Sequence, residues 1–204
     1  MKKDSMLYVV IFTFAVCAAF VVVLAVANEV TKPMVEANKL FATRSAVLGA
    51  LGIPYANAAD ASARYDAQVK ELAGAVGKAW TSSIDGVEYI AVEAAGPGLW
   101  GTIRVILAAS PDGERVRGIR VVAQNETPGL GGRIEEPWFL GQFEGERAPG
   151  GRVAVKAGAE ASGKADADKE NGRVDGISGA TRTSQSFEAI VNAGLAALKA
   201  GGVR

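Results

Sequence analysis

The feature that most constrains the fold of this chain is an uncharged apolar segment, Met6 to Ala27, close to the N-terminus. As a helix that rises about 1.5 Å per residue, this segment reaches roughly 33 Å, enough to cross a bilayer core of about 30 Å. We therefore expect one transmembrane helix over residues 6–27, which anchors the chain in a lipid bilayer.

Charge near this segment predicts its orientation. Lys2 and Lys3 precede it, and positive charge favours the cytoplasmic side. Residues 1–5 are thus expected in the cytoplasm, and everything after Asn28 on the periplasmic, extracytoplasmic face. The triplet Ala25–Ala27 has the A-x-A form of a signal-peptide cleavage site, so a cleaved leader is the alternative. The segment is longer than the apolar core of a leader, about 7–15 residues, which favours an uncleaved anchor.

The composition excludes several kinds of site. Lys+Arg and Asp+Glu balance at 22 each, and no basic cluster contains interleaved aromatic residues, so we expect no nucleic-acid partner. The chain has no histidine, which removes histidine-based triads and histidine-ligated zinc or haem. The single cysteine, Cys17, excludes disulfides within the chain and iron–sulfur ligation. We expect no catalytic residue and no metal site, so any redox chemistry requires a cofactor.

Residues 28–80 are predicted to form a juxtamembrane helical stalk and linker. Pro33–Leu51 has the composition of a stalk helix, and Gly52–Ala63 is small and polar, as in a linker. Arg64–Val76 is predicted as a further, weak helix.

Residues 81–204 are predicted to form an α+β domain with an antiparallel sheet and a closing C-terminal helix. Apolar and alternating segments predict strands at Val87–Glu93, Thr102–Ala108 and Val116–Ala123, with a further candidate at Arg152–Ala157. The second and third of these strands are joined by a turn at Ser110–Glu114, and Ala159–Arg173 is predicted as a polar surface loop.

The closing helix follows a seven-residue segment, Asp175–Thr181. Apolar residues recur behind it at helical spacing: Phe187, Ile190, Val191, Gly194, Leu195 and Leu198. Asp-Gly is turn chemistry, and serine and threonine are N-cap residues, so the segment is predicted to be a turn that opens the helix. Gly179 and Ala180 leave the backbone bare beside the Thr181 hydroxyl. A helix N-terminus suits a phosphate, so the segment is predicted to offer a hydroxyl nucleophile or a phosphate anchor, and the alternative is a helix cap only.

Two glycine-rich segments partly match nucleotide-binding motifs. Gly96–Gly101 satisfies G-x-G-x-x-G, but a strand follows it where a dinucleotide fingerprint needs a helix. We expect a turn between two strands, with Trp100 packed on the sheet. Gly158–Ala165 approaches a P-loop but ends in alanine where the motif requires the hydroxyl of serine or threonine.

The segment Glu126–Gly132 directly follows a predicted strand. Its glycines allow the backbone to approach a flat ligand, and Pro128 stiffens the loop. Backbone N–H groups there suit a ring edge, and Leu130 suits a ring face. The alternative is a rigid structural turn.

The segment before the closing helix, Asp175–Thr181, and the loop that begins at Glu126 both resemble motifs of one family. Asp-x-x-Ser-Gly-Ala-Thr at 175–181 is similar to the flavinylation motif of the FMN-binding subunits of Rnf and Na⁺-translocating NADH:quinone reductase (Nqr) complexes. The Glu126–Gly131 segment resembles their Glu-Thr-Pro-Gly-Leu-Gly loop, and Glu135–Phe139 resembles the segment after it. Family members often carry histidine where this chain has Gln124.

The resemblance implies FMN, joined by a flavin transferase through a phosphoester bond to Thr181. The implied cofactor-binding residues are Thr181, Asp175, Ser178, Gly179, Ala180, Thr183, Glu126, Thr127, Gly129, Leu130 and Gly131. Asp175 is expected to serve the transferase or to shape the turn.

The implied function is a single-pass electron-transfer subunit of the bacterial inner membrane, a redox part of a Na⁺- or H⁺-translocating oxidoreductase. Its implied partners are the other membrane subunits of an Rnf- or Nqr-type complex. The resemblance does not separate the Rnf type from the Nqr type. The alternative function is an anchored FMN-binding or sensory domain outside such a complex, and a structural module without a cofactor is a third.

Overall fold

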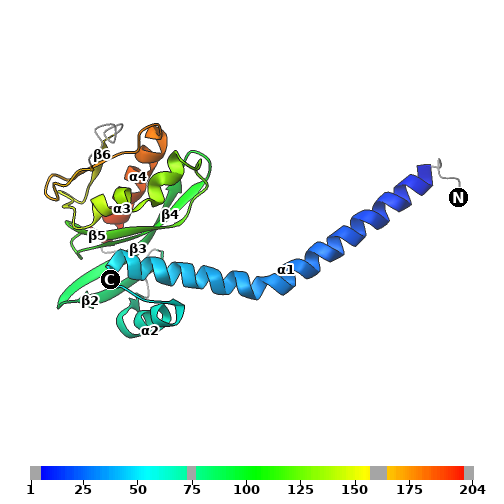
Figure 1. Cartoon of the computed structure of the whole chain (residues 1–204), viewed down its shortest axis with the longest axis horizontal. Helices are drawn as coiled ribbons and strands as arrows, with labels where there is room; N and C mark the ends of the chain where they lie inside the picture. The colour runs from blue at the N-terminus through cyan, green and yellow to red at the C-terminus, as the bar shows by residue number, and fades with distance from the viewer. Residues whose placement is uncertain (1–5, 73–76, 157–164, 200–204) are drawn as a thin grey trace. The chain divides into compact units, whose positions relative to one another are not determined.

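A computed structural model describes residues 6–72, 77–156 and 165–199 (Figure 1). The chain divides into two compact units, residues 1–41 and 42–204. The described part of the first unit belongs entirely to helix α1 (Met6–Leu51), whose most apolar window has a mean hydropathy of 3.1. This helix is long and apolar enough to cross a membrane, which agrees with the expected N-terminal helix. The predicted stalk helix Pro33–Leu51 is its continuation.

The second unit is built on a five-stranded antiparallel sheet in the order β1-β2-β3-β4-β5. The strands are β1 (Lys70–Glu71), β2 (Ala79–Ile84), β3 (Val87–Pro97), β4 (Thr102–Ala109) and β5 (Val116–Ala123). Strands that are adjacent in the sheet are also consecutive in the chain, and short turns connect β2 to β3, β3 to β4 and β4 to β5.

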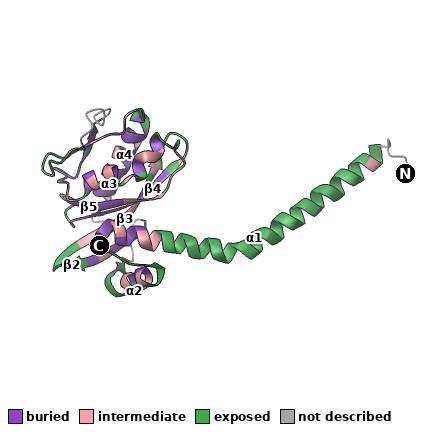
Figure 2. Cartoon of the chain, in the orientation of Figure 1, coloured by how far each residue is buried: buried purple, intermediate pink, exposed green. Residues whose placement is uncertain are grey.

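Both faces of this sheet are covered, and the central strand β4 shows why. Its Val105 and Leu107 pack into the core beneath helix α4 (Thr181–Lys199), whereas Ile106 and Ala108 pack on the opposite side. The opposite core contains the end of α1, residues 46–51, and helix α2 (Ala58–Gln68) (Figures 1 and 2). Burial on both faces explains why Val105–Ala109 of β4 are an unbroken apolar run rather than an alternating one.

Smaller elements complete the domain on the α4 side. They are the 3₁₀ helix η1 (Gly131–Glu135), helix α3 (Pro137–Phe143), and the parallel pair β6 (Ala154–Lys156) and β7 (Arg173–Asp175). Phe139, Phe143 and Phe187 pack edge to face or tilted against one another, with ring centroids 5.2–5.6 Å apart, and join α3 to α4.

The antiparallel sheet and the closing helix confirm the predicted α+β class, and the strands predicted from residues 87, 102 and 116 are confirmed. The helix predicted at Arg64–Val76 is wrong beyond Gln68, because Lys70–Glu71 pairs with Thr81 and Trp80 in the sheet. Within the predicted linker, α2 already begins at Ala58. Residues 73–76 and 157–164, the latter holding most of the segment compared with a P-loop, lie outside the described residues.

Candidate functional site

The segment 175–181 is a turn that opens α4, as predicted. Gly179 has a φ of +78°, which glycine adopts without strain, and the N–H of Ala180 donates to the carbonyl of Ile177 at 3.1 Å. The Ser184 N–H then donates to the carbonyl of Ala180 at 2.9 Å and starts the helix. Thr181 is the first helical residue and is exposed. Its hydroxyl makes no hydrogen bond to any described residue.

Asp175, the first residue of the segment, ends strand β7 and is half-buried. The side-chain amide of Gln142 on α3 binds its backbone on both sides: Oε1 accepts the Asp175 N–H at 2.9 Å, and Nε2 donates to the Asp175 carbonyl at 3.1 Å. Across residues 6–72, 77–156 and 165–199, the Asp175 carboxylate has no hydrogen-bond or ion-pair partner.

A buried carboxylate, Glu126, joins three separate parts of the chain. It is 5% exposed, and its Oε1 accepts the N–H groups of Leu99 and Trp100 at 2.9 and 3.0 Å. Its Oε2 accepts the hydroxyl of Thr183 on α4 at 2.5 Å. The Glu126 carboxylate therefore holds the glycine-rich turn Gly96–Gly101 against the first turn of α4.

The loop after Glu126 is a tight turn. The Leu130 N–H donates to the Thr127 carbonyl at 3.1 Å, with Pro128 and Gly129 between them and a φ of +74° at Gly129. Proline followed by a positive-φ glycine is typical of a type II turn. A Cβ on Gly179 would lie 3.3 Å from Leu130 Cδ2, so this turn lies directly beside the start of α4.

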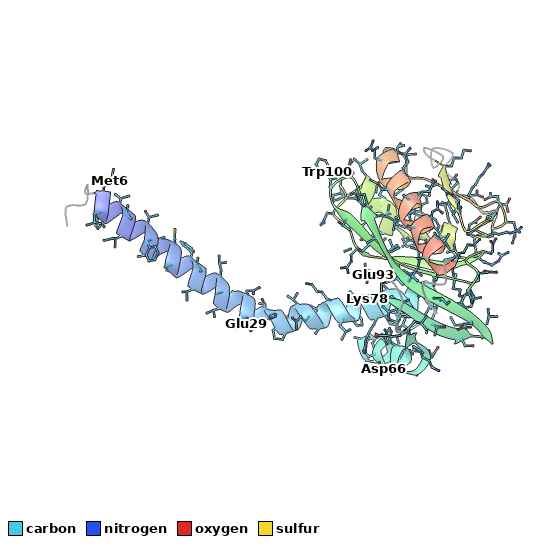
Figure 3. All side chains as sticks on the ribbon, turned by 180° about the vertical axis from the view of Figure 1, so that it is seen from behind. Met6, Glu29, Asp66, Lys78, Glu93 and Trp100 are labelled. Carbon is cyan, nitrogen blue, oxygen red and sulfur yellow. The ribbon has the colours of Figure 1, made fainter. Side chains whose placement is uncertain are left out.

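The Glu126–Gly132 loop, the Gly96–Gly101 turn and the start of α4 meet at one place, here called the junction. Large apolar side chains around this junction are exposed. Leu99, Trp100 and Leu130 are 53%, 69% and 45% exposed, and they come from two different loops. The prediction that Trp100 packs on the sheet is wrong, because the residue sits in the β3–β4 turn and projects from the domain (Figure 3). The turn itself is confirmed, closed by a 2.7 Å hydrogen bond from the Gly98 N–H to the Gly101 carbonyl.

A groove of about 410 Å³ runs between the end of β3 and α4. It is lined by Ala95, Gly96, Pro97, Arg182, Gln185, Ser186, Ala189, Ile190 and Ala193. Arg182 follows Thr181 directly and is exposed, and within the described residues it has no carboxylate partner. The groove thus begins at the N-terminus of α4 with a free positive charge beside it.

The structure separates the residues singled out from sequence into two groups. Thr181, Gly179, Thr127, Gly129 and Leu130 are exposed around the junction. Glu126, Thr183, Gly131 and Ala180 are buried beneath it, and Ser178 is half-buried like Asp175. Sequence reasoning missed Gln142, Leu99 and Arg182; only Arg182 carried a local signal, its position next to Thr181.

Residues 98–196 match the FMN-binding domain family. NqrC of the Na⁺-translocating NADH-quinone reductase from Vibrio anguillarum is 39% identical over 106 residues, which cover 51% of this chain and 40% of that protein. The same protein from Neisseria meningitidis serogroup A is 39% identical over 95 residues, which cover 46% of this chain and 35% of that protein. The matched part of this chain therefore spans less than half the length of these relatives.

Solved structures share the fold. A crystal structure of NqrC from Parabacteroides distasonis has a TM-score of 0.66 at 24% identity and covers 82% of this chain and 95% of that one. Shewanella oneidensis NqrC has a TM-score of 0.67 at 19% identity, with coverages of 81% and 100%. Among the described residues, α1 is the one helix long and apolar enough to cross a membrane, and together with the similarity to NqrC it supports a membrane anchor. Residues 98–196, just under half of this chain, thus match the FMN-binding domain family, and the relatives and solved structures to which the chain is similar are NqrC proteins.

Proposed function

We propose that this chain carries FMN on Thr181 through a phosphoester bond and acts as an electron-transfer subunit of an Nqr- or Rnf-type complex. One observation supports this more than any other. The loop bearing Leu130 lies against Gly179, two residues before an exposed threonine that begins a helix. Two segments that resemble separate motifs of one family thus meet at one place.

The residues at this place fit FMN. Leu99, Trp100 and Leu130 offer apolar surface for the flat isoalloxazine ring, although they are exposed in the chain alone. The N-terminus of α4 and the Arg182 guanidinium favour the negative charge that a phosphodiester keeps. Glu126 and Thr183 bind each other rather than facing outward, so we assign them to support of the loops.

Attachment requires an activated flavin. A flavin dinucleotide donor satisfies this: the Thr181 oxygen forms a bond to the flavin-side phosphorus, and the phosphoanhydride bond breaks. The departing nucleoside monophosphate takes the bonding electron pair, and the hydroxyl proton passes to a base of the transferase. We propose that the Asp175 carboxylate serves this enzyme, because it has no partner among the described residues. Once attached, FMN would supply the electron acceptance and donation for which no side chain of this chain is suited.

The attachment is tested by flavin fluorescence in a denaturing gel, after incubation of the purified full-length chain with a flavin transferase and flavin dinucleotide. The chain is expected to fluoresce, and Thr181→Val is expected to be dark. Thr81→Val provides the matched control, because Thr81 lies on β2, distant from Thr181 in the chain and outside the junction. A fluorescent Thr181→Val band would refute the assignment of Thr181.

Membership in a complex and the periplasmic position of the domain are separate proposals. Extraction in a mild detergent is expected to recover several polytopic membrane subunits with the chain, whereas an anchored sensory domain would be recovered without them. For orientation, Thr102→Cys in a Cys17→Ser background places a thiol at an exposed position of the domain. A membrane-impermeant maleimide applied to cells with a permeabilised outer membrane should label this thiol. Labelling only after lysis would show that the domain lies on the cytoplasmic side instead.

A further inference from the structure

The segment 175–181 is held by side chains from outside it, chiefly by Gln142. Gln142 lies on α3, 33 residues before Asp175, and is 2% exposed. Its Oε1 accepts the N–H of Asp166 at 3.0 Å as well as that of Asp175 at 2.9 Å, and its Nε2 donates to the Asp175 carbonyl at 3.1 Å. A single buried amide thus fixes both backbone groups of the first residue of the segment.

The arrangement resembles the addition of a strand to β7. On one side β7 pairs with β6, where Lys156 lies opposite Asp175 and the Gly176 N–H donates to the Lys156 carbonyl at 2.8 Å. On the other side no strand of the described residues pairs with β7, and the Gln142 amide supplies the donor and acceptor that a neighbouring strand would offer. The backbone is therefore hydrogen-bonded to Gln142 at Asp175 and to β6 at Gly176.

The next two residues of the segment, Gly176 and Ile177, are also held in place. Ile177 is fully buried, and its N–H donates to the Ser184 hydroxyl oxygen at 3.1 Å. A Cβ on Gly176 would lie 3.0 Å from the Lys156 carbonyl and 3.2 Å from Ser184 Oγ, so the packing leaves little room there for a side chain. Neither the Asp175 carboxylate nor the Thr181 hydroxyl has a hydrogen-bond partner among the described residues.

We propose that Gln142 is a positioning residue for flavin attachment and that the transferase recognises the segment in its folded conformation. This rests on the proposed function, because it concerns how Thr181 is presented. Gln142 and Ser184 fix the backbone that separates the Asp175 carboxylate from the Thr181 hydroxyl. A transferase that binds the first group finds the second at a constant place, and the entropy of ordering the acceptor has already been lost on folding.

The test uses the full-length chain in detergent, a purified flavin transferase and flavin dinucleotide. Gln142→Met keeps the length of the side chain but removes its donor and acceptors. Hydrogen exchange of the Asp175 and Ile177 amides is expected to accelerate at least about tenfold, a change of about 1.4 kcal/mol, while amides of β4 keep their protection. The initial rate of flavin incorporation is expected to fall by at least a similar factor. Gln68→Met, at the exposed end of α2, is the matched control and should change neither quantity.

Different results separate the possible failures. If exchange accelerates in Gln142→Met but incorporation keeps its rate, or if a peptide of residues 170–186 is labelled as fast as the chain, recognition of the folded segment is refuted. If Gln142→Met fails to unfold cooperatively, Ser184→Ala takes its place, because it removes only the acceptor of the Ile177 N–H. If the unaltered chain takes up no flavin, the proposed function fails, and the exchange measurement still shows whether Gln142 holds the segment.

Discussion

The hydrogen bonds of Glu126 make a sharp prediction about stability. The Glu126 carboxylate is 5% exposed and accepts three hydrogen bonds, from the N–H groups of Leu99 and Trp100 and from the Thr183 hydroxyl. In Glu126→Ala all three donors lose their acceptor. The glycine-rich turn and the start of α4 then have no direct polar connection through this residue.

The three donors differ in the expected cost. Thr183 is 2% exposed, so its hydroxyl cannot turn to water, and an unsatisfied buried group costs about 1–3 kcal/mol. Leu99 and Trp100 lie in an exposed turn where water reaches the backbone, so each N–H loses only about 0.5–1.5 kcal/mol. We expect Glu126→Ala to lower the free energy of unfolding by about 2–6 kcal/mol. In Glu126→Gln the carbonyl oxygen still accepts both N–H groups and the NH₂ donates to Thr183, so the expected loss is below about 1 kcal/mol.

The assay is urea unfolding of the domain followed by circular dichroism, in a double-mutant cycle with Thr183→Val. Removing either partner removes the same hydrogen bond, so the coupling energy should be about 1–2 kcal/mol in favour of the pair. Additive effects of Glu126→Ala and Thr183→Val, or a loss below about 0.5 kcal/mol for Glu126→Ala, would show that the carboxylate does not connect these loops.

Three further predictions concern the scaffold. A chain that begins at Ala42 should fold, because it keeps the whole second unit. A chain that begins at Pro54 lacks the buried end of α1 and should lose about 5–9 kcal/mol of its free energy of unfolding. Cooperative unfolding of this shorter chain would contradict the role of α1 in the core. Gly194→Val should cost about 1–3 kcal/mol in urea unfolding, because a Cβ there already lies 2.8 Å from Leu107 Cδ2, and an unchanged midpoint would contradict this close packing. Burial raises the pKa of Glu146 from its usual value of 4.5. The contribution of this carboxyl group to the free energy of unfolding is therefore fully present below about pH 4.5 and is lost as the pH rises through the raised pKa. Glu146→Gln should remove this part of the pH dependence, and identical stability–pH curves would refute it.

Local patterns in the sequence predicted the elements whose cause is local. The helical spacing of Phe187, Ile190 and Val191 placed α4, and the apolar run from Thr102 placed β4, because each signal lies within one element. The turn at Ser110–Glu114 followed from its proline and glycine in the same way. The long apolar helix was evident from composition alone.

What escaped prediction depends on contacts between distant residues. Gln142 binds a backbone 33 residues away, and nothing around it distinguishes it from a surface glutamine. The hydrogen bonds of Glu126 were not predictable either, because their donors lie 26–57 residues away in the chain. Trp100 was expected on the sheet, but it lies in the β3–β4 turn and is 69% exposed.

The most direct test of the central claim is mass spectrometry of the chain after incubation with a flavin transferase and flavin dinucleotide. Trypsin cleavage after Arg173 and Arg182 releases residues 174–182, in which Ser178 and Thr181 carry the only hydroxyls. We predict that this peptide gains the mass of FMN less one water and that fragmentation places the gain on Thr181. A gain on Ser178, or an unmodified peptide while a control substrate is labelled, would contradict the account.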